Sequence, residues 1–125
     1  MTAMTYRQTV YVVGGDKAVS HSLRFLLETH QFVVKAVSNI DQFVSQTKLS
    51  EQDIILLDVD DTEPRIFRML NELLFAVKRP NIILTSTMES VLRETDTFKG
   101  DRIKVLFHPV APRILLDTIK ILTGT

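Results

Sequence analysis

Residues 53–58 have the sequence Asp53-Ile54-Ile55-Leu56-Leu57-Asp58, and this stretch decides the fold class. Its apolar residues follow one another without alternating with polar ones. A strand with this pattern is covered on both faces, as the strands of parallel α/β sheets are. The stretch therefore predicts a central strand of such a sheet.

Further short apolar runs, rich in β-branched residues, occur on both sides of this strand along the chain. They predict strands over residues 9–13, 32–37, 81–85 and 103–107. A helix is predicted after every strand, from the spacing of apolar residues and from prolines that can open or close a helix. The predicted helices cover residues 17–30, 39–47, 64–78, 89–98 and 112–122.

A strand followed by a helix thus occurs five times. Right-handed crossovers and short links then favour a doubly wound sheet with helices on both sides. We expect an α/β fold with a five-stranded parallel sheet, (βα)5 and flavodoxin-like, with strand order 2-1-3-4-5. Ligands of such sheets bind at the carboxyl ends of the strands, so functional side chains are expected at residues 14–16, 58–61, 85–87 and 108–109.

The first and last helices are each expected to bury one apolar stripe. In the first helix, the stripe consists of Val19, Leu23, Leu26 and His30, with Ala18, Ser22 and Phe25 beside it. In the last helix, the residues at core spacing are Ile114, Leu115, Thr118, Ile119 and Leu122.

The charge balance excludes some classes of protein. The 125 residues include 15 Lys and Arg and 15 Asp and Glu, so the formal net charge is zero at pH 7. Proteins that grip nucleic acid by its phosphates usually carry a basic surplus, so direct nucleic-acid binding is not expected. The chain contains no cysteine, which excludes disulfides, thiolate zinc sites and cysteine nucleophiles.

The apolar segments are short. The longest uninterrupted one, residues 73–77, is far below the roughly 20 residues of a membrane span, and residues 1–7 lack the apolar segment of a signal peptide. We expect a single cytoplasmic domain over residues 1–125, with a core from about 8 to 123 and no membrane contact.

In this order of elements, the chain resembles a response-regulator receiver domain over about residues 8–123. Residues 19–29, Val-Ser-His-Ser-Leu-Arg-Phe-Leu-Leu-Glu-Thr, resemble the first helix of the nitrogen-fixation and nodulation regulators, the branch that the chain resembles most. Residues 54–59 resemble the strand that carries the family's phosphoacceptor. Thr85 matches the hydroxyl that ends strand four, and His108-Pro109 stands in place of the family's Lys-Pro.

The resemblance implies a phosphorylation pocket, and the sequence departs from it. The family uses an acidic pair that binds Mg²⁺, a nucleophilic Asp, a Lys and a Ser or Thr hydroxyl. Asp58 matches the nucleophile and Thr85 the hydroxyl. Gly14 and Gly15 replace the acidic pair, and His108, a cation only when protonated, replaces the Lys. We interpret the pocket as degenerate, which makes the chain a pseudo-receiver.

Two metal-site hypotheses remain open. Asp16 follows the two glycines, and we interpret it as a helix cap rather than a ligand. With Asp58 it would form a weak Mg²⁺ site at most. The alternative is that Asp60, Asp61 or Glu63 rebuilds the site from the loop after the third strand.

Asp58 also has two interpretations. It is either a retained phosphoacceptor, or a structural acid held by His108, Thr85 or main-chain N–H groups, and we favour the structural acid. If Asp58 and His108 face each other, the carboxylate would raise the pKa of the imidazole, and the pair could then replace the family's Lys–Asp contact at mildly acid pH.

We therefore expect a signal-transduction module of a two-component, phosphorelay or transcription-control system that acts mainly through protein contacts. Phosphorylation is expected to be absent or weakened, with no enzyme activity beyond residual self-phosphorylation at Asp58. The alternative is a competent receiver that phosphorylates itself at Asp58 from a histidine kinase or a small phosphodonor. Only this alternative requires Mg²⁺, and no other cofactor is expected. A third hypothesis is a flavin-binding protein of the same topology.

The resemblance to receiver domains implies an interaction surface formed by the fourth helix, the fifth strand and the fifth helix. A protein partner or a second copy of the chain is expected there, because charges of both signs suit a specific protein contact. The residues of this surface are Arg93, Glu94, Arg102, Lys104, Arg113, Asp117, Lys120 and Ile121.

Overall fold

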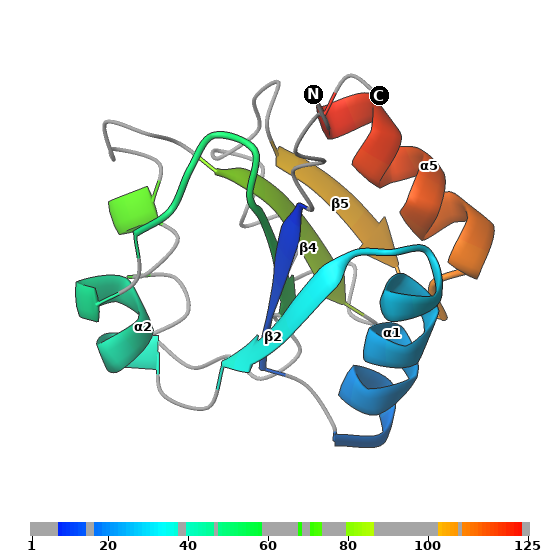
Figure 1. Ribbon diagram of the computed structural model, residues 1–125, viewed down its shortest axis with the longest axis horizontal. Coiled ribbons are helices and arrows are strands. Elements are labelled where there is room, and N and C mark those ends of the chain that lie inside the picture. Colours follow the sequence, from blue (N-terminus) through cyan, green and yellow to red (C-terminus); the bar gives the residue numbers. More distant parts are fainter. Residues whose placement is uncertain are drawn as a thin grey trace, which may run out of the picture.

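A computed structural model gives the structure of the chain. It describes residues 8–14, 17–37, 40–46, 48–58, 68, 71–73, 80–86, 103–107 and 109–123, apart from the side chains of residues 19, 40, 44 and 46. Five strands form one parallel sheet in the order β2-β1-β3-β4-β5, so the predicted sheet and strand order are confirmed (Figure 1). The strands are β1 (Thr9–Val13), β2 (Val33–Val37), β3 (Ile54–Asp58), β4 (Asn81–Ser86) and β5 (Ile103–Phe107).

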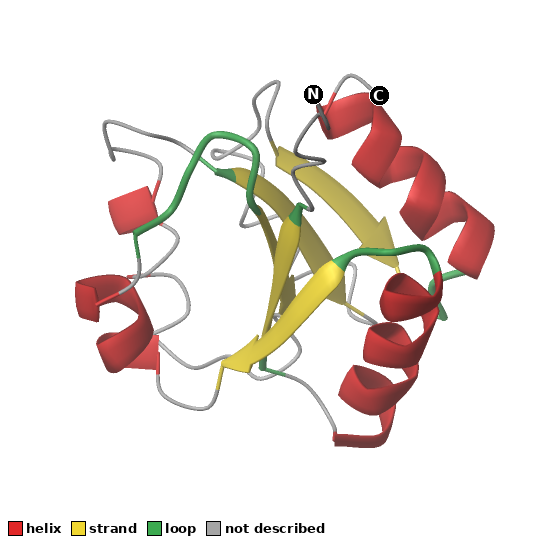
Figure 2. Cartoon of the chain, viewed as in Figure 1, coloured by secondary structure: helices red, strands yellow, loops and turns green. Residues whose placement is uncertain are grey.

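Helices cover both faces of the sheet. The helices α1 (Lys17–Thr29) and α5 (Pro112–Thr123) lie on one face, and α2 (Ile40–Gln46) lies on the other (Figures 1 and 2). Arg68 and residues 71–73 are also helical, within the predicted helix 64–78. The rest of that helix and the predicted helix 89–98 lie outside the described residues. Among the described residues, no helix has the length and apolar character that crossing a membrane requires.

The strand β3 is the centre of the core. Residues 54–57 are all buried, because β1 and β4 flank the strand and helices cover its two faces. The continuous apolar run, which left no face for solvent, thus predicted the position of this strand correctly.

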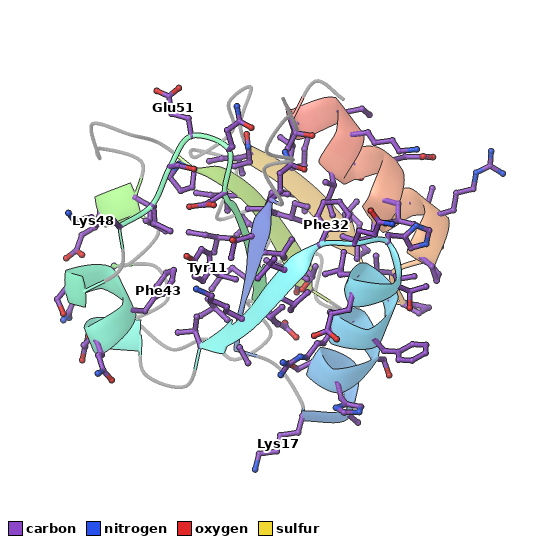
Figure 3. The ribbon with its side chains drawn as sticks, viewed as in Figure 1. Tyr11, Lys17, Phe32, Phe43, Lys48 and Glu51 are labelled. Atoms are coloured by element: carbon purple, nitrogen blue, oxygen red, sulfur yellow. The ribbon has the colours of Figure 1, made fainter. Side chains whose placement is uncertain are left out.

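Alternate residues of the strands build two separate cores. The core beneath α1 and α5 consists of Val10, Val12, Leu27, Val34, Ile54, Leu56, Ile83, Leu115 and Ile119. The core on the α2 side consists of Tyr11, Val13, Phe43, Ile55, Leu57, Leu73, Ile82, Leu84 and Ile103. On that side, the rings of Tyr11 and Phe43 pack with centroids 5.0 Å apart and planes tilted by 56° (Figure 3).

The end of α1 corrects the predicted apolar stripe. Leu27, which the stripe omitted, is fully buried, and His30, which it included, lies exposed beyond the last turn. The helix ends because Gln31 adopts a left-handed backbone with a φ of 70°. The Phe32 N–H then donates to the Leu27 carbonyl at 3.0 Å, and that of Gln31 donates to the Glu28 carbonyl at 3.0 Å. This is a Schellman ending, in which the chain reverses and leads into β2.

In α5, one predicted core residue is in fact exposed. Leu115, Thr118 and Ile119 are buried as expected, but Ile114 is exposed. A step of one residue turns the helix by about 100°, so Ile114 lies on the flank beside Leu115 rather than beneath the helix. The helix begins at Pro112, whose fixed φ suits a first helical position.

A buried polar turn ties together the amino ends of β3 and β4. Asp53 is only 4% exposed, and its Oδ2 accepts a hydrogen bond of 2.8 Å from the Ser50 N–H. The side-chain amide of the buried Asn81 donates to the Glu51 carbonyl at 3.1 Å. The backbone N–H of Asn81 donates to the Asp53 carbonyl at 2.9 Å. These bonds satisfy polar groups that burial would otherwise leave unpaired.

Candidate functional site

The carboxyl ends of β3 and β4 place two of the predicted site residues together. Asp58 is the last residue of β3, Thr85 lies near the end of β4, and the two are partners in the parallel register. Register partners in neighbouring strands carry their side chains on the same face of the sheet. The predicted nucleophile and hydroxyl positions are therefore neighbours.

The alternation along each strand identifies this face. Leu56 and Ile83 belong to the core beneath α1 and α5, and Asp58 and Thr85 each follow two residues later. Both side chains therefore point to the α1 and α5 side of the sheet, beyond the edge of that core. Asp58 is half-buried, whereas Thr85 is only 2% exposed.

The Thr85 hydroxyl lies in an unusual setting for a buried polar group. Within the part of the chain that the structure describes, it forms no hydrogen bond with another protein group. Such a group normally finds a partner, because burial removes its bonds to water.

Among the described residues, the neighbouring end of β1 supplies no acid at this edge. Val13 is the register partner of Leu57, so Gly14, the next residue, lies beside Asp58. Gly14 is exposed and has a φ of 76°, a left-handed conformation that suits glycine. Gly14 itself places no carboxylate next to Asp58.

The remaining predicted site residues lie outside the described residues. They are Gly15, Asp16 and His108, together with the loop acids Asp60, Asp61 and Glu63. The predicted contact between His108 and Asp58, and the predicted cap at Asp16, therefore stay predictions.

The described residues at this edge do not form a donor set for Mg²⁺. They offer the Asp58 carboxylate but no second acid, and no group of three His, Cys, Asp or Glu residues is found in the described part of the chain. Protein sites for this ion use hard oxygen ligands in octahedral geometry, commonly one or two carboxylates with water and phosphate. Of the acidic pair and the nucleophile that the resemblance implies, the described residues supply one carboxylate, that of Asp58.

Sequence reasoning assigned no role to a second hydroxyl at this edge. Ser86 lies one residue after Thr85, is fully buried and is the register partner of Phe107. By alternation it points to the α2 side of the sheet. The expected crevice at residues 85–87 contained this residue, but a sequence pattern does not show which of two adjacent hydroxyls faces Asp58.

Exposed apolar side chains lie on two helices and at one strand end. Ile114 and Ile121 lie on one flank of α5, two turns apart, and Phe107 ends the edge strand β5. Arg113, Asp117 and Lys120 are exposed on the same helix. The described residues of the predicted interaction surface are Lys104, Arg113, Asp117, Lys120 and Ile121, whereas Arg93, Glu94 and Arg102 lie outside the described residues. Phe25 is exposed on α1, although it was predicted to lie beside the buried stripe.

Known proteins resemble the chain in structure rather than in sequence. No protein-family model matches the chain, and no curated protein matches it in sequence. Among solved structures, a response regulator from Colwellia psychrerythraea superposes with a TM-score of 0.77 and 22% identity, over 95% of this chain and 98% of the other. A response regulator receiver protein from Burkholderia phymatum gives a TM-score of 0.75 and 22% identity, over 94% and 96% of the two chains.

The same similarity extends to a chemotaxis protein. CheY4 of Vibrio cholerae, crystallised at low pH, matches with a TM-score of 0.75 and 15% identity, over 94% of this chain and 99% of that protein. Similarity in structure at such low identity establishes the architecture alone. The chain therefore has the fold of response regulator receiver domains.

Proposed function

We propose that the chain is a receiver-like signalling module that acts mainly through protein contacts, with phosphorylation at Asp58 weakened or absent. The receiver fold supports the signalling role, and the carboxyl edge of the sheet supports the loss of phosphorylation. The resemblance of residues 19–29 to the first helix of nitrogen-fixation and nodulation regulators supports a place near that branch. The proposal includes a cytoplasmic location, no direct contact with nucleic acid or membrane, and no enzyme activity.

The observation that carries the proposal is Gly14 beside Asp58. Phosphorylation would transfer a phosphoryl group to an Asp58 carboxylate oxygen while the bond from phosphorus to the donor breaks. Negative charge must then approach a negative carboxylate, which costs free energy unless cations or hydrogen-bond donors are already in place. Gly14 and Gly15 lack the carboxylates that would hold the Mg²⁺ cation, and His108 stands in place of the permanent cation, so both sources of positive charge in the family's pocket are weakened.

The exposed residues of β5 and α5 support the proposed protein contact. Ile114 and Ile121 form an exposed apolar flank, and charges of both signs lie on the same helix. Apolar contacts rimmed by mixed charges are typical of specific protein interfaces. We propose that a protein partner or a second copy of the chain binds over the predicted fourth helix, β5 and α5.

A competent receiver is the second candidate function, and the pair of Asp58 and Thr85 favours it. The Thr85 hydroxyl is buried beside the carboxylate and could donate to a phosphoryl oxygen. In this case, a histidine kinase or a small phosphodonor would supply the phosphoryl group, and Mg²⁺ would be required.

Phosphotransfer to the purified chain distinguishes the two candidates. The chain is incubated with acetyl phosphate and Mg²⁺ and its intact mass is measured, with Asp58→Asn as the matched control. We expect no stoichiometric phosphoryl adduct and no Mg²⁺ binding in calorimetry. A stoichiometric adduct in the wild type that is absent from Asp58→Asn would overturn the proposal and establish the competent receiver.

A further inference from the structure

The helix α1 exposes an aromatic side chain that no described part of the chain covers. Phe25 is 73% exposed, whereas Leu27 on the same helix is fully buried against the sheet. Ala18, Ser22 and Phe25 are all exposed and follow at spacings of four and three residues. This spacing places them along one outer stripe of α1.

An apolar groove runs beside this outer stripe. It lies between α1 and the segment from Pro109 to Pro112 and has a volume of about 370 Å³. Ala18 and Ser22 line it, so the groove and the outer stripe share these two residues. The other lining residues are Leu23, Leu26, Pro109, Val110 and Pro112. The same helix thus carries a protruding aromatic ring and a hollow next to small side chains.

The charges of α1 run opposite to the usual order along a helix. Lys17 lies in the first turn and projects away from the sheet (Figure 3), and Glu28 lies near the last turn. The helix dipole favours acids at the amino end and bases at the carboxyl end. Glu28 accepts a hydrogen bond from Arg24 Nε at 2.7 Å, and both side chains remain about half exposed. A second helix that ran in the opposite direction would bring an acid to the basic end and a base to the acidic end.

We infer that two copies of the chain associate through α1, antiparallel and related by a twofold axis near Leu23, the middle of the helix. This symmetry places residue 25 of one copy level with residue 21 of the other. Phe25 then packs between Ala18 and Ser22 of the second copy, at the mouth of its groove. The same symmetry sets Lys17 of each copy one residue from the level of Glu28 in the other.

The charge pattern identifies the occupant as a second copy. The twofold axis lies in the interface and is perpendicular to the helices, so the flank with Lys17 and Glu28 faces the same flank of the other copy. Each interface therefore contains two oppositely charged pairs, together with two copies of the Phe25 contact. Such self-complementarity is the property that a symmetric dimer requires. The contact involves about 20 Å of one helix, which corresponds to a small and weak interface. If the second copy binds at α1, the exposed residues of β5 and α5 stay free to bind a different protein.

Sedimentation of the full chain tests the dimer without any phosphodonor. We expect reversible dimerisation between about 10 μM and 1 mM, and a loss of affinity of about tenfold or more in Phe25→Ala. The matched control is Lys35→Ala on β2, an exposed residue on the α2 side of the sheet, and this variant should leave dimerisation unchanged. Both variants should keep the melting temperature of the wild type, because both side chains are already exposed in the monomer.

Charge reversal tests the antiparallel geometry. Lys17→Glu and Glu28→Lys should each weaken dimerisation about fivefold, because each change places like charges together twice per dimer. The double variant restores opposite charges and should return to within about twofold of the wild type. A chain that stays monomeric up to about 1 mM, a dimer that Phe25→Ala weakens no more than Lys35→Ala does, or a double variant no better than the single ones would each overturn the inference. None of these results depends on whether Asp58 is phosphorylated.

Discussion

Asp58 and Thr85 are register partners at the carboxyl ends of β3 and β4, and both side chains point to the sheet face that α1 and α5 cover. The carboxylate is half-buried and the hydroxyl beside it is buried. The structure therefore brings together the two side chains to which the resemblance to receiver domains assigns phosphoryl transfer. Gly14, the residue that follows β1, lies beside Asp58 and adds no charge there.

Replacement of Thr85 by Val tests whether this hydroxyl holds the fold together. Since the hydroxyl forms no hydrogen bond within the described residues, its loss should raise the free energy of unfolding by about 1 kcal/mol. Urea denaturation measures the change. Thr118→Val is the matched control, because the buried Thr118 hydroxyl donates to the Ile114 carbonyl at 2.7 Å, and its loss should destabilise the chain by about 0.5–1 kcal/mol. An equal loss at both positions would show that Thr85 is structural.

Asp53 is predicted to stabilise the edge of the sheet where β3 and β4 begin, opposite the edge that carries Asp58 and Thr85. Asp53→Ala removes the acceptor of the Ser50 N–H and should lower the free energy of unfolding by about 2 kcal/mol, because the turn is buried. Thermal and urea unfolding give this value. Asp117→Ala, on the exposed side of α5, serves as the control and should change stability by no more than about 0.5 kcal/mol. Two equal changes would contradict the structural role of Asp53.

Gln31 is predicted to be a site where glycine stabilises the fold. Its φ of 70° is unfavourable for a residue with a Cβ atom. Gln31→Gly should therefore raise the free energy of unfolding by about 0.5–1 kcal/mol, whereas Gln31→Ala keeps the Cβ atom and should give no gain. The comparison of the two variants in urea denaturation decides the point, and a glycine variant less stable than the alanine variant would refute it.

Restoration of the missing charges should create phosphorylation. Gly14→Asp and Gly15→Asp, combined with His108→Lys, return the acidic pair and the permanent cation of the receiver pocket. We expect the rate of Mg²⁺-dependent labelling by acetyl phosphate to rise about a hundredfold, as measured by intact mass.

Gly14→Asp alone should lower the free energy of unfolding by about 1 kcal/mol, because residue 14 has a φ of 76°.

The control for phosphorylation of the triple variant is the same variant with Asp58→Asn added, which should give no phosphoryl adduct. An unchanged labelling rate in the triple variant would contradict the proposal that missing charges limit the reaction.

Much of the fold could be predicted from the sequence, because burial on both faces leaves a direct pattern. The apolar run from Ile54 to Leu57 predicted the central strand, and the repeated order of strand and helix predicted the parallel sheet and its strand order. Burial on helices was predicted less well. Leu27 was left out of the stripe of α1, and Ile114 was placed in the core, because periodicity alone does not show where the centre of the buried face lies.

The candidate site was predictable only in part. The resemblance identified Asp58 and Thr85 from their places at strand ends. That resemblance did not show that the Thr85 hydroxyl lacks a hydrogen bond within the described residues, since this depends on the groups that packing brings around it. It also gave no sign of the groove beside α1, because Ala18 and Pro112 are far apart along the chain.

The sequence by itself determined the succession of strands and helices, the absence of cysteine and of net charge, and the presence of two glycines, Gly14 and Gly15, directly after the first strand. These are local properties, fixed by the order of side chains. Only the tertiary structure decided that Asp58 lies beside Thr85 and that Phe25 faces outward next to a groove. Such relationships arise when strands pair in one register and helices pack in one orientation, and the free energy of that packing is shared among residues distant in sequence.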